Sequence, residues 1–199
     1  MPLAPAKAAS FQTRSERTDE LAAVAFNTDL GFMAIAFRDE VLMGVVFGHP
    51  SRATASAALE RYLRAQHRDL QLIDLFGEQQ LPAAIDDLVI RLKAYAAGDE
   101  VDFSDVPIDE RHLTDFGRKI VRACRRIARG KTRSYGQLAT QCGSPGAARA
   151  VGQVMARNRY PLVVPCHRVL AAGGLLGGFS APQGLSMKRR LLAMEQAAG

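Results

Sequence analysis

The charge of this chain changes sign about half-way along it, and this division constrains its organisation more than any other feature. Residues 1–109 contain 10 Lys or Arg and 17 Asp or Glu side chains, a balance of −7. Residues 110–199 contain 16 basic and 3 acidic side chains, a balance of +13, which gives the whole chain its net charge of +6. The change falls at residues 98–109, an acidic and irregular stretch that contains Pro107. We therefore predict a domain boundary there, between an N-terminal domain over residues 26–109 and a C-terminal domain over 110–199.

The basic C-terminal half predicts a polyanionic partner, and duplex nucleic acid is the commonest one. Two other interpretations of the same charge stay open at this point. The arginines could form an ordinary solvated surface, or they could pair with the acidic half of the same chain.

The composition excludes several classes of protein. Hydrophobic residues make up 48% and charged residues 23% of the chain, which is ordinary for a globular protein. No apolar run approaches the roughly 20 residues of a membrane helix, so we expect no membrane association. The first 20 residues lack the apolar core of a signal peptide, and three cysteines do not make a disulfide framework. We therefore expect a cytoplasmic protein, associated with the nucleoid if the source is bacterial.

The N-terminal half reads as a flexible tail followed by alternating strands and helices. Residues 1–25 lack apolar periodicity. Ser51 is a suitable helix cap, and Pro82 suits the first turn of a helix with apolar residues at helical spacing. The predicted elements are strands at 32–37, 41–47 and 71–75, a helix to about residue 63, and a helix whose buried side is Ile85, Leu88, Val89 and Leu92.

The C-terminal half reads as helices. Thr114 is a suitable cap for a helix that ends at Gly130, and Ser134 for a short helix over residues 135–141. A glycine-containing break at 143–146 precedes an alanine-rich helix over 147–157, and the last helix covers 186–196. A short helix, a tight turn and a second helix resemble a helix-turn-helix, although an ordinary helical hairpin has the same pattern.

Cys166 is the candidate nucleophile because His167 follows it directly and Pro165 precedes it. A free thiol with a pKa near ~8.5 is only a few per cent thiolate at neutral pH, so a neighbouring base or cation is needed. The alternative is a buried, inert cysteine, and Cys124 and Cys142 fit that interpretation. No metal-ligand spacing and no phosphate-binding glycine motif occurs, so we expect no metal and no cofactor.

The residues around Cys166 resemble the active-site motif of the O6-alkylguanine-DNA alkyltransferases, also called methylated-DNA–protein-cysteine methyltransferases. The motif is Pro-Cys-His-Arg-Val at residues 165–169. Other parts of the family pattern occur in the family's order over about residues 113–196. They are Ser-Tyr-Gly-Gln-Leu-Ala at 134–139, Ala-Arg-Ala-Val-Gly at 148–152, Asn158, Lys188 and Glu195.

This resemblance implies an α+β fold. It consists of a small N-terminal α/β domain of ribonuclease-H-like type and a C-terminal helical domain with a winged helix-turn-helix-like DNA-binding motif. The implied activity is DNA repair by direct reversal, in which O6-alkylguanine is flipped out of the duplex and its alkyl group is transferred irreversibly, once per molecule. The activity toward O4-alkylthymine stays open. The implied partner is double-stranded DNA containing alkylated bases, bound by a monomer, and cooperative assembly on DNA stays open.

The resemblance also implies catalytic roles, residue by residue. Cys166 would accept the alkyl group, and His167 would relay a proton through water. Glu195 would orient His167 and support the thiolate. Asn158 would tie the helix pair to the active-site segment. Tyr135 would use its hydroxyl on the flipped base and help to rotate the target phosphate.

A second set of residues would contact the base and the DNA. Arg149 would enter the base stack as a finger. Ser180 would offer a hydrogen bond toward the guanine oxygen, and Phe179 stands where many relatives have tyrosine. The implied substrate contacts are Ser180, Val169, Phe179, Met155 and Pro161, and the implied DNA contacts are Arg149, Tyr135, Gly136, Ser144 and Ala172.

Two other functions compete with this interpretation. A non-catalytic alkyltransferase-like protein would bind damaged bases without repairing them, but such proteins lack the acceptor cysteine that Cys166 supplies. A thiol hydrolase would use Cys166 and His167 repeatedly, but it leaves the basic helix pair without a role. Residues 180–184 form a longer segment than in some relatives, which leaves the width of the alkyl pocket open.

Overall fold

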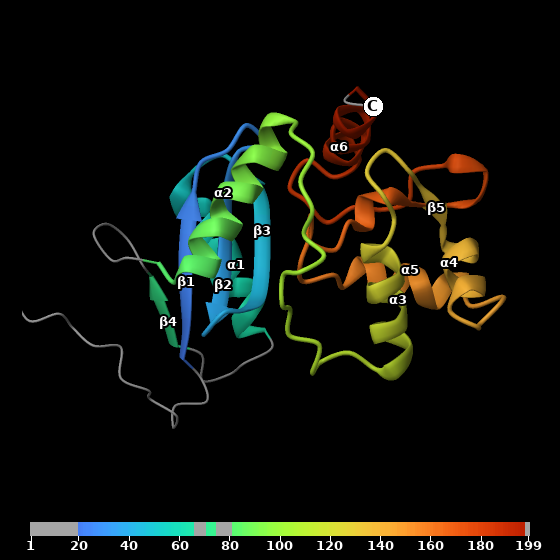
Figure 1. Ribbon diagram of the computed structural model, residues 1–199, viewed down its shortest axis with the longest axis horizontal. Helices are drawn as coiled ribbons and strands as arrows, with labels where there is room; N and C mark the ends of the chain where they lie inside the picture. Colours follow the sequence, from blue (N-terminus) through green and yellow to red (C-terminus); the bar gives the residue numbers. More distant parts are fainter. Residues whose placement is uncertain (1–19, 66–70, 75–80, 198–199) are drawn as a thin grey trace, which may run out of the picture.

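The N-terminal half of the chain is built on a four-stranded sheet (Figure 1). The computed structural model describes residues 20–65, 71–74 and 81–197. The spatial order of the strands is β3-β2-β1-β4, with β1–β2 and β2–β3 antiparallel and β4 parallel to β1. The strands are β1 (Glu20–Phe26), β2 (Phe32–Arg38), β3 (Val41–His49) and β4 (Gln71–Asp74).

One helix covers each face of this sheet (Figure 1). Helix α1 (Arg52–Arg64) packs Leu59 and Leu63 on a face made largely of alanines. Gly44 of β3 contributes no side chain there, and a Cβ added to it would lie 3.4 Å from the methyl groups of both leucines. Small side chains therefore let α1 lie close to the sheet. Helix α2 (Ala83–Ala97) covers the opposite face, which carries the larger side chains of the core.

The predicted hairpin and both predicted helices of this half are confirmed. Strands β2 and β3 flank a turn in which Asp39 has a φ of 54°, a left-handed conformation that aspartate tolerates. Ser51 caps α1 in a reciprocal capping box with Thr54. In α2, Pro82 precedes the first turn, and the predicted apolar stripe that includes Leu92 is buried.

The predicted tail over residues 1–25 is wrong for residues 20–25, because β1 begins at Glu20. Residues 1–19 lie outside the described residues. Strand β1 is an inner strand, with Leu21 packing on the α1 side and Phe26 on the α2 side. Such a strand lacks the apolar–polar alternation that marks a half-exposed one, and its alanines are poor strand formers.

The C-terminal half consists of short helices around one pair of short parallel strands. The mainly antiparallel four-stranded sheet and the helices together make a mixed α+β protein, as the resemblance implied. The elements are α3 (Asp115–Arg125), β5 (Arg133–Ser134), α4 (Tyr135–Gln141), α5 (Ala148–Ala156), the 3-10 turn η1 (Cys166–Arg168), β6 (Val169–Leu170), the 3-10 turn η2 (Ala172–Gly174) and α6 (Leu185–Ala197).

Helix α3 ends at Arg125, five residues before the predicted end at Gly130. Thr114 caps its start as predicted. At the other end, the backbone N–H of Ile127 turns back to Cys124 in a tighter, 3-10-type bond. The carbonyl of Ile127 instead accepts the Arg168 guanidinium at 2.6 Å, so a residue 41 positions away satisfies a helix-end carbonyl.

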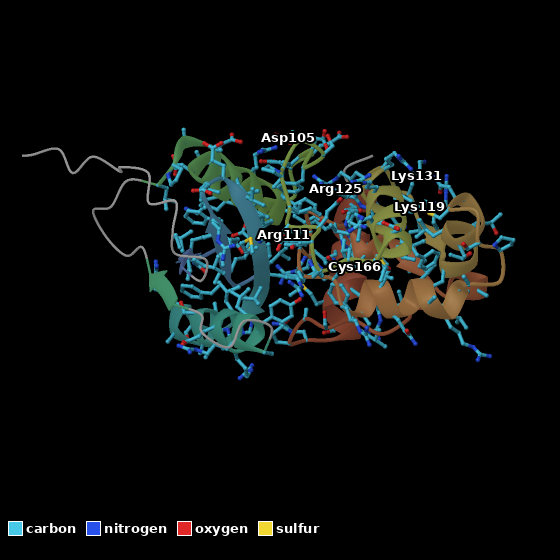
Figure 2. All side chains as sticks on the ribbon, turned by 90° about the horizontal axis from the view of Figure 1, so that it is seen from below. Asp105, Arg111, Lys119, Arg125, Lys131 and Cys166 are labelled. Atoms are coloured by element: carbon cyan, nitrogen blue, oxygen red, sulfur yellow. The ribbon has the colours of Figure 1, made fainter. Side chains whose placement is uncertain are left out.

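Part of the basic charge is used inside the chain, at the acidic stretch between the two halves. Arg111 pairs with Asp109 across the boundary, and Arg125 donates to the backbone carbonyls of Phe103, Ser104 and Val106. In Figure 2, Arg125 lies beside this stretch, near Asp105. The pairing of the basic and acidic halves that the sequence left open therefore accounts for some of the arginines, and a smaller excess remains for an external partner.

One hydrophobic core runs from the α2 side of the sheet into the C-terminal helices. A backbone hydrogen bond crosses the same junction, from the N–H of Val45 in β3 to the carbonyl of Arg159 at 2.9 Å. Because the two halves share this core, the predicted domain boundary at residue 109 stays a prediction. In the described part of the chain, no helix is long and apolar enough to cross a lipid bilayer.

We predict that Leu92→Ala lowers the free energy of unfolding by about 2–5 kcal/mol, because it leaves a cavity in this core. Leu92 is 0% exposed, whereas Ile90, two residues away on the same helix, is 59% exposed. The matched control Ile90→Ala is expected to change the same quantity by less than about 0.5 kcal/mol. Urea unfolding followed by circular dichroism measures both, and equal losses would contradict the packing described above.

Candidate active site

A constrained segment carries the chain from α5 to Cys166. Leu162 is buried and has a φ of 74°, an uncommon conformation for a residue with a branched side chain. The side-chain amide of Asn158 donates to the carbonyl of Val164 at 2.9 Å, and its oxygen accepts the N–H of Tyr160 at 3.0 Å. Since Asn158 lies two residues after the end of α5, these bonds fix the active-site segment to that helix.

Tyr135 is brought to the same region by the two short parallel strands. Strand β5 pairs with β6, which directly follows η1. Ser134 ends β5 and caps α4 in a capping box with Gln137, so Tyr135 occupies the first position of that helix. The pKa of Tyr135 is raised by burial and by the neighbouring Cys166 charge, which agrees with this placement.

Cys166 is a protonated thiol in the free protein. It is 7% exposed, and burial raises its pKa above the usual range. A hydrogen bond from Asn158 and the charge of Lys188 act in the opposite direction. Because the thiol is protonated in the free protein, it must lose its proton during the reaction rather than before it.

His167 and Glu195 form a fully buried pair. The imidazole Nε2 lies 2.8 Å from the Glu195 carboxylate, whereas Nδ1 has no hydrogen-bond partner among the described residues. Burial lowers the pKa of His167, so the ring is neutral at pH 7. Because the carboxylate accepts, Nε2 carries the proton, and Nδ1 is left with a free lone pair.

Glu195 is held ionised by several donors. Burial alone would raise its pKa, but donation by His167 and Arg168 lowers the pKa well below the usual range. Arg168 donates through Nε at 2.9 Å to Oε2 and through Nη2 at 2.8 Å to Oε1. Tyr95, from α2 in the N-terminal half, donates its hydroxyl to Oε1 at 2.7 Å. The carboxylate therefore joins three elements that are far apart in sequence.

Lys188 places a buried cation close to Cys166. Its Nζ donates to the carbonyl of Val169 at 2.7 Å, and the side chain is buried. Burial lowers the pKa of Lys188, while the neighbouring Cys166 and Cys124 raise it. An ammonium group at this place favours a thiolate on Cys166 electrostatically.

The segment after β6 is attached to the N-terminal sheet. The ring of Phe179 lies edge-on to Phe47 of β3, with a centroid separation of 6.2 Å. The side chain of Gln183 donates to the carbonyl of Gly48 at 2.6 Å. A Cβ added to Gly177 would lie 2.5 Å from the Tyr135 hydroxyl, so this loop covers Tyr135 closely.

No group of three or more His, Cys, Asp or Glu side chains could hold a metal ion within residues 20–65, 71–74 and 81–197. The residues that surround Cys166 offer a thiol, a neutral imidazole, a carboxylate and an ammonium group. This arrangement suits nucleophilic displacement with proton transfer to a base.

Three comparisons place the chain among known proteins. The family model described as 6-O-methylguanine DNA methyltransferase, DNA binding domain, matches residues 115–197. The methylated-DNA–protein-cysteine methyltransferase of Mycolicibacterium paratuberculosis is 45% identical over 120 residues, which cover 60% of this chain and 70% of that relative. The chain belongs to the methylated-DNA–protein-cysteine methyltransferase family.

Solved structures of this methyltransferase family have the same fold as the chain. The crystal structure of Mycobacterium tuberculosis OGT in complex with DNA aligns with a TM-score of 0.67 at 32% identity, covering 88% of this chain and 93% of that one. The O6-methylguanine-DNA methyltransferase of Pyrococcus kodakaraensis aligns with a TM-score of 0.63 at 26% identity, covering 88% and 98%. The likeness therefore includes the N-terminal half, which the family model does not cover.

The predicted site residues of this methyltransferase-family chain fall into two groups. Cys166, His167 and Glu195 lie together in the interior, and Asn158 and Tyr135 lie beside them. The roles of the other residues stay predictions. Met155 and Val169 are buried, Pro161, Phe179, Gly136 and Ser144 are half-buried, and Arg149, Ala172 and Ser180 are exposed.

Sequence reasoning missed two members of the methyltransferase's buried cluster. Arg168 belongs to the Pro-Cys-His-Arg-Val motif but received no predicted role, although it makes the most extensive contact with Glu195. Tyr95 lies outside the residues that carry the resemblance. A tyrosine on the buried side of α2, in line with Leu88 and Leu92, was the available signal, because a buried hydroxyl needs a hydrogen-bond partner.

We predict that Glu195→Gln lowers the free energy of unfolding by about 3–5 kcal/mol at pH 7, because it leaves Arg168 buried without its counter-charge. The folded-state pKa of Glu195 is lowered, so its stabilisation is present above the unfolded-state pKa near ~4.3 and is lost as the pH falls below it. The difference in the free energy of unfolding between wild type and Glu195→Gln is therefore expected to become smaller below about pH 4.

Chemical denaturation at pH 7 and pH 3.5 measures this difference. Glu60→Gln is the matched control, because Glu60 pairs with Arg64 on the exposed side of α1. Its expected effect is below about 1 kcal/mol at either pH. If the loss of unfolding free energy in Glu195→Gln is the same at pH 7 and pH 3.5, the Glu195 carboxylate is not ionised in the folded protein as described above.

Proposed function

We propose that this protein repairs DNA by direct reversal, transferring an alkyl group from O6-alkylguanine in duplex DNA to its own Cys166. The observation that carries the proposal is the buried His167–Glu195 pair next to Cys166, in a chain of the methylated-DNA–protein-cysteine methyltransferase family. The geometry supplies what an unreactive thiol needs, namely a neutral base and a nearby cation. We propose that this repair takes place in the cytoplasm, where chromosomal DNA is accessible if the source is bacterial.

Proton transfer comes first in the proposed mechanism. The Cys166 thiol gives its proton through one water molecule to the free Nδ1 of His167, whose Nε2–H remains bonded to Glu195. The imidazolium that forms is stabilised by the carboxylate, in the manner of other nucleophile–base–carboxylate sets. Lys188 stabilises the thiolate at the same moment.

Transfer of the alkyl group follows as a single displacement. The Cys166 sulfur attacks the alkyl carbon, an S–C bond forms and the C–O6 bond breaks, with its electron pair leaving on guanine. Guanine then takes up one proton, which balances the proton lost by Cys166. We propose that Tyr135 and Ser180 contact the base during this step, and that Phe179 forms part of its wall. Met155, Pro161 and Val169 would line the rest of the pocket.

The product is a thioether, which the neighbouring imidazole and carboxylate cannot hydrolyse under ordinary conditions. Each molecule would therefore act once and be inactivated. Cys166 itself argues against a non-catalytic, damage-binding role. A thiol hydrolase stays testable, because it would release its thiol after every cycle.

DNA binding is assigned to the helix pair α4 and α5. Arg149 is exposed on the first turn of α5, and a Cβ added to Gly152 would meet no atom within 4 Å. Small side chains on this helix let it approach the duplex, while Gly136, Ser144 and Ala172 would contact the phosphate backbone. An arginine inserted into the stack can offset the cost of extruding a base, roughly a few kcal/mol. We propose that the protein binds as a monomer.

We predict one equivalent of S-alkyl-cysteine per molecule, located at Cys166, after mixing with excess O6-methylguanine duplex. Intact-mass and peptide mass spectrometry measure the stoichiometry and the site. Cys166→Ser is expected to bind the duplex and form no adduct, while the control Cys142→Ser is expected to react like the wild type. Repeated turnover with recovery of the free thiol would indicate the hydrolase instead.

We predict that Arg149→Ala slows repair of duplex O6-methylguanine at least about tenfold, but changes the reaction with free O6-methylguanine base by less than about twofold. The reason is that the finger is needed only where a base must leave a stack. Arg64→Ala, which removes the same charge from the exposed side of α1, is the control and is expected to change neither rate. Equal losses of rate on the duplex and on the free base would contradict the proposed insertion of Arg149 into the base stack.

A further inference from the structure

Tyr95 connects the N-terminal half of the chain to the proton-transfer residues of the C-terminal half. It lies near the end of α2, and its side chain is 1% exposed. Its hydroxyl donates to Oε1 of Glu195 at 2.7 Å and lies 3.3 Å from Nε2 of His167. The same Glu195 oxygen lies 2.8 Å from Nε2, so the hydroxyl, the carboxylate oxygen and the imidazole nitrogen form a closed triangle.

Packing fixes the position of the Tyr95 hydroxyl. The guanidinium of Arg129 lies over the ring, 5.6 Å from its centroid, and Phe103 lies edge-on at 5.9 Å. Arg129 is itself held by the carbonyls of Gly98 and Asp99 at the end of α2, at 2.7 and 2.8 Å. The ring therefore has contacts on several sides that do not involve its oxygen.

The triangle has one consistent arrangement of protons. Tyr95 donates to Glu195, so its oxygen presents a lone pair toward His167. The Nε2–H of His167 is then shared between two acceptors, the carboxylate and the phenol oxygen. Both contacts require the proton on Nε2, and this leaves Nδ1 as the proton acceptor.

We propose that Tyr95 is a positioning residue for alkyl transfer, which holds His167 in the neutral Nε2–H tautomer by donating to Glu195 and accepting from Nε2. This inference rests on the proposed function of Cys166 and His167. It assigns the N-terminal half a direct part in the chemistry, through a residue outside the matched segment 115–197.

The charges around His167 give the direction of the expected effect. Glu195 and Lys188 face it from α6, Arg168 and Cys166 flank it in the chain, and Tyr95 approaches from α2. Loss of the Tyr95 donor leaves the carboxylate with fewer hydrogen bonds and therefore more basic. A more basic carboxylate favours the imidazolium, which cannot accept a proton from Cys166.

The test compares Tyr95→Phe with the wild type in the rate of duplex alkyl transfer between pH 5 and 9. We expect the acid limb of the profile to move to higher pH by roughly 0.5–1 unit, which lowers the rate roughly 3- to 10-fold on that limb. At pH 9 the two rates are expected to agree within about twofold. Tyr160→Phe is the matched control, because Tyr160 is equally buried and its hydroxyl binds the carbonyl of Asp109 at 2.6 Å.

Two further measurements keep the test decisive. Long-range 1H–15N NMR of His167 in the DNA-free protein reports its tautomer and pKa without any reaction, so failure of the proposed function and failure of the Tyr95 role are distinguishable. Site-specific 3-fluorotyrosine at position 95 keeps the packing and makes the hydroxyl a stronger donor, and it is expected to move the acid limb to lower pH. A uniform rate loss at every pH, matched by Tyr160→Phe, or a His167 pKa that is the same in Tyr95→Phe and in the wild type would overturn the proposal.

Discussion

The buried carboxylate of Glu195 is the interaction on which the active site depends. A charge in the protein interior is costly unless it is paired and hydrogen-bonded. Glu195 satisfies this requirement with donors from α2, from η1 and from the backbone N–H of Gly130. Arg168 connects η1 to the carboxylate, and Tyr95 connects α2 to it. His167 donates to the same carboxylate, which fixes its tautomer. Arg168 also binds the carbonyl of Ile127, so the end of α3 is held by the same guanidinium. Folding and the arrangement for proton transfer therefore depend on the same hydrogen bonds.

This arrangement keeps the nucleophile inactive until it is needed. Burial raises the pKa of Cys166 and lowers that of His167, so the resting pair is a neutral thiol and a neutral imidazole. A proton must cross from one to the other before the sulfur can attack. If each molecule transfers one alkyl group, as proposed, a thiol that does not react with other electrophiles is an advantage, because an early reaction would consume the molecule. The strained Leu162 and the bonds of Asn158 hold the segment where that transfer is possible.

The two halves of the chain are more closely joined than their opposite charges suggest. Arg111, Arg125 and Arg129 bind the acidic stretch that precedes α3, and Gln183 binds the carbonyl of Gly48 in β3. The segment that carries Phe179 and Ser180 is thus attached to the sheet rather than to the helices alone. The N-terminal half accordingly makes two contacts with this region, through Tyr95 to Glu195 and through Phe47 to Phe179.

Local sequence patterns determined the hairpin, the capped helices α1 and α4 and the motif around Cys166, because turns, caps and short motifs depend on neighbouring residues. The sequence by itself did not show β1, since a strand buried on both faces lacks alternation, and it placed the end of α3 too late, since Arg168 takes up the carbonyl of Ile127. Only the tertiary structure decided which charges are paired within the chain and that Tyr95 reaches Glu195 across 100 residues. Hydrogen bonds between distant segments have no periodicity to detect, so their partners are known only once the chain is folded.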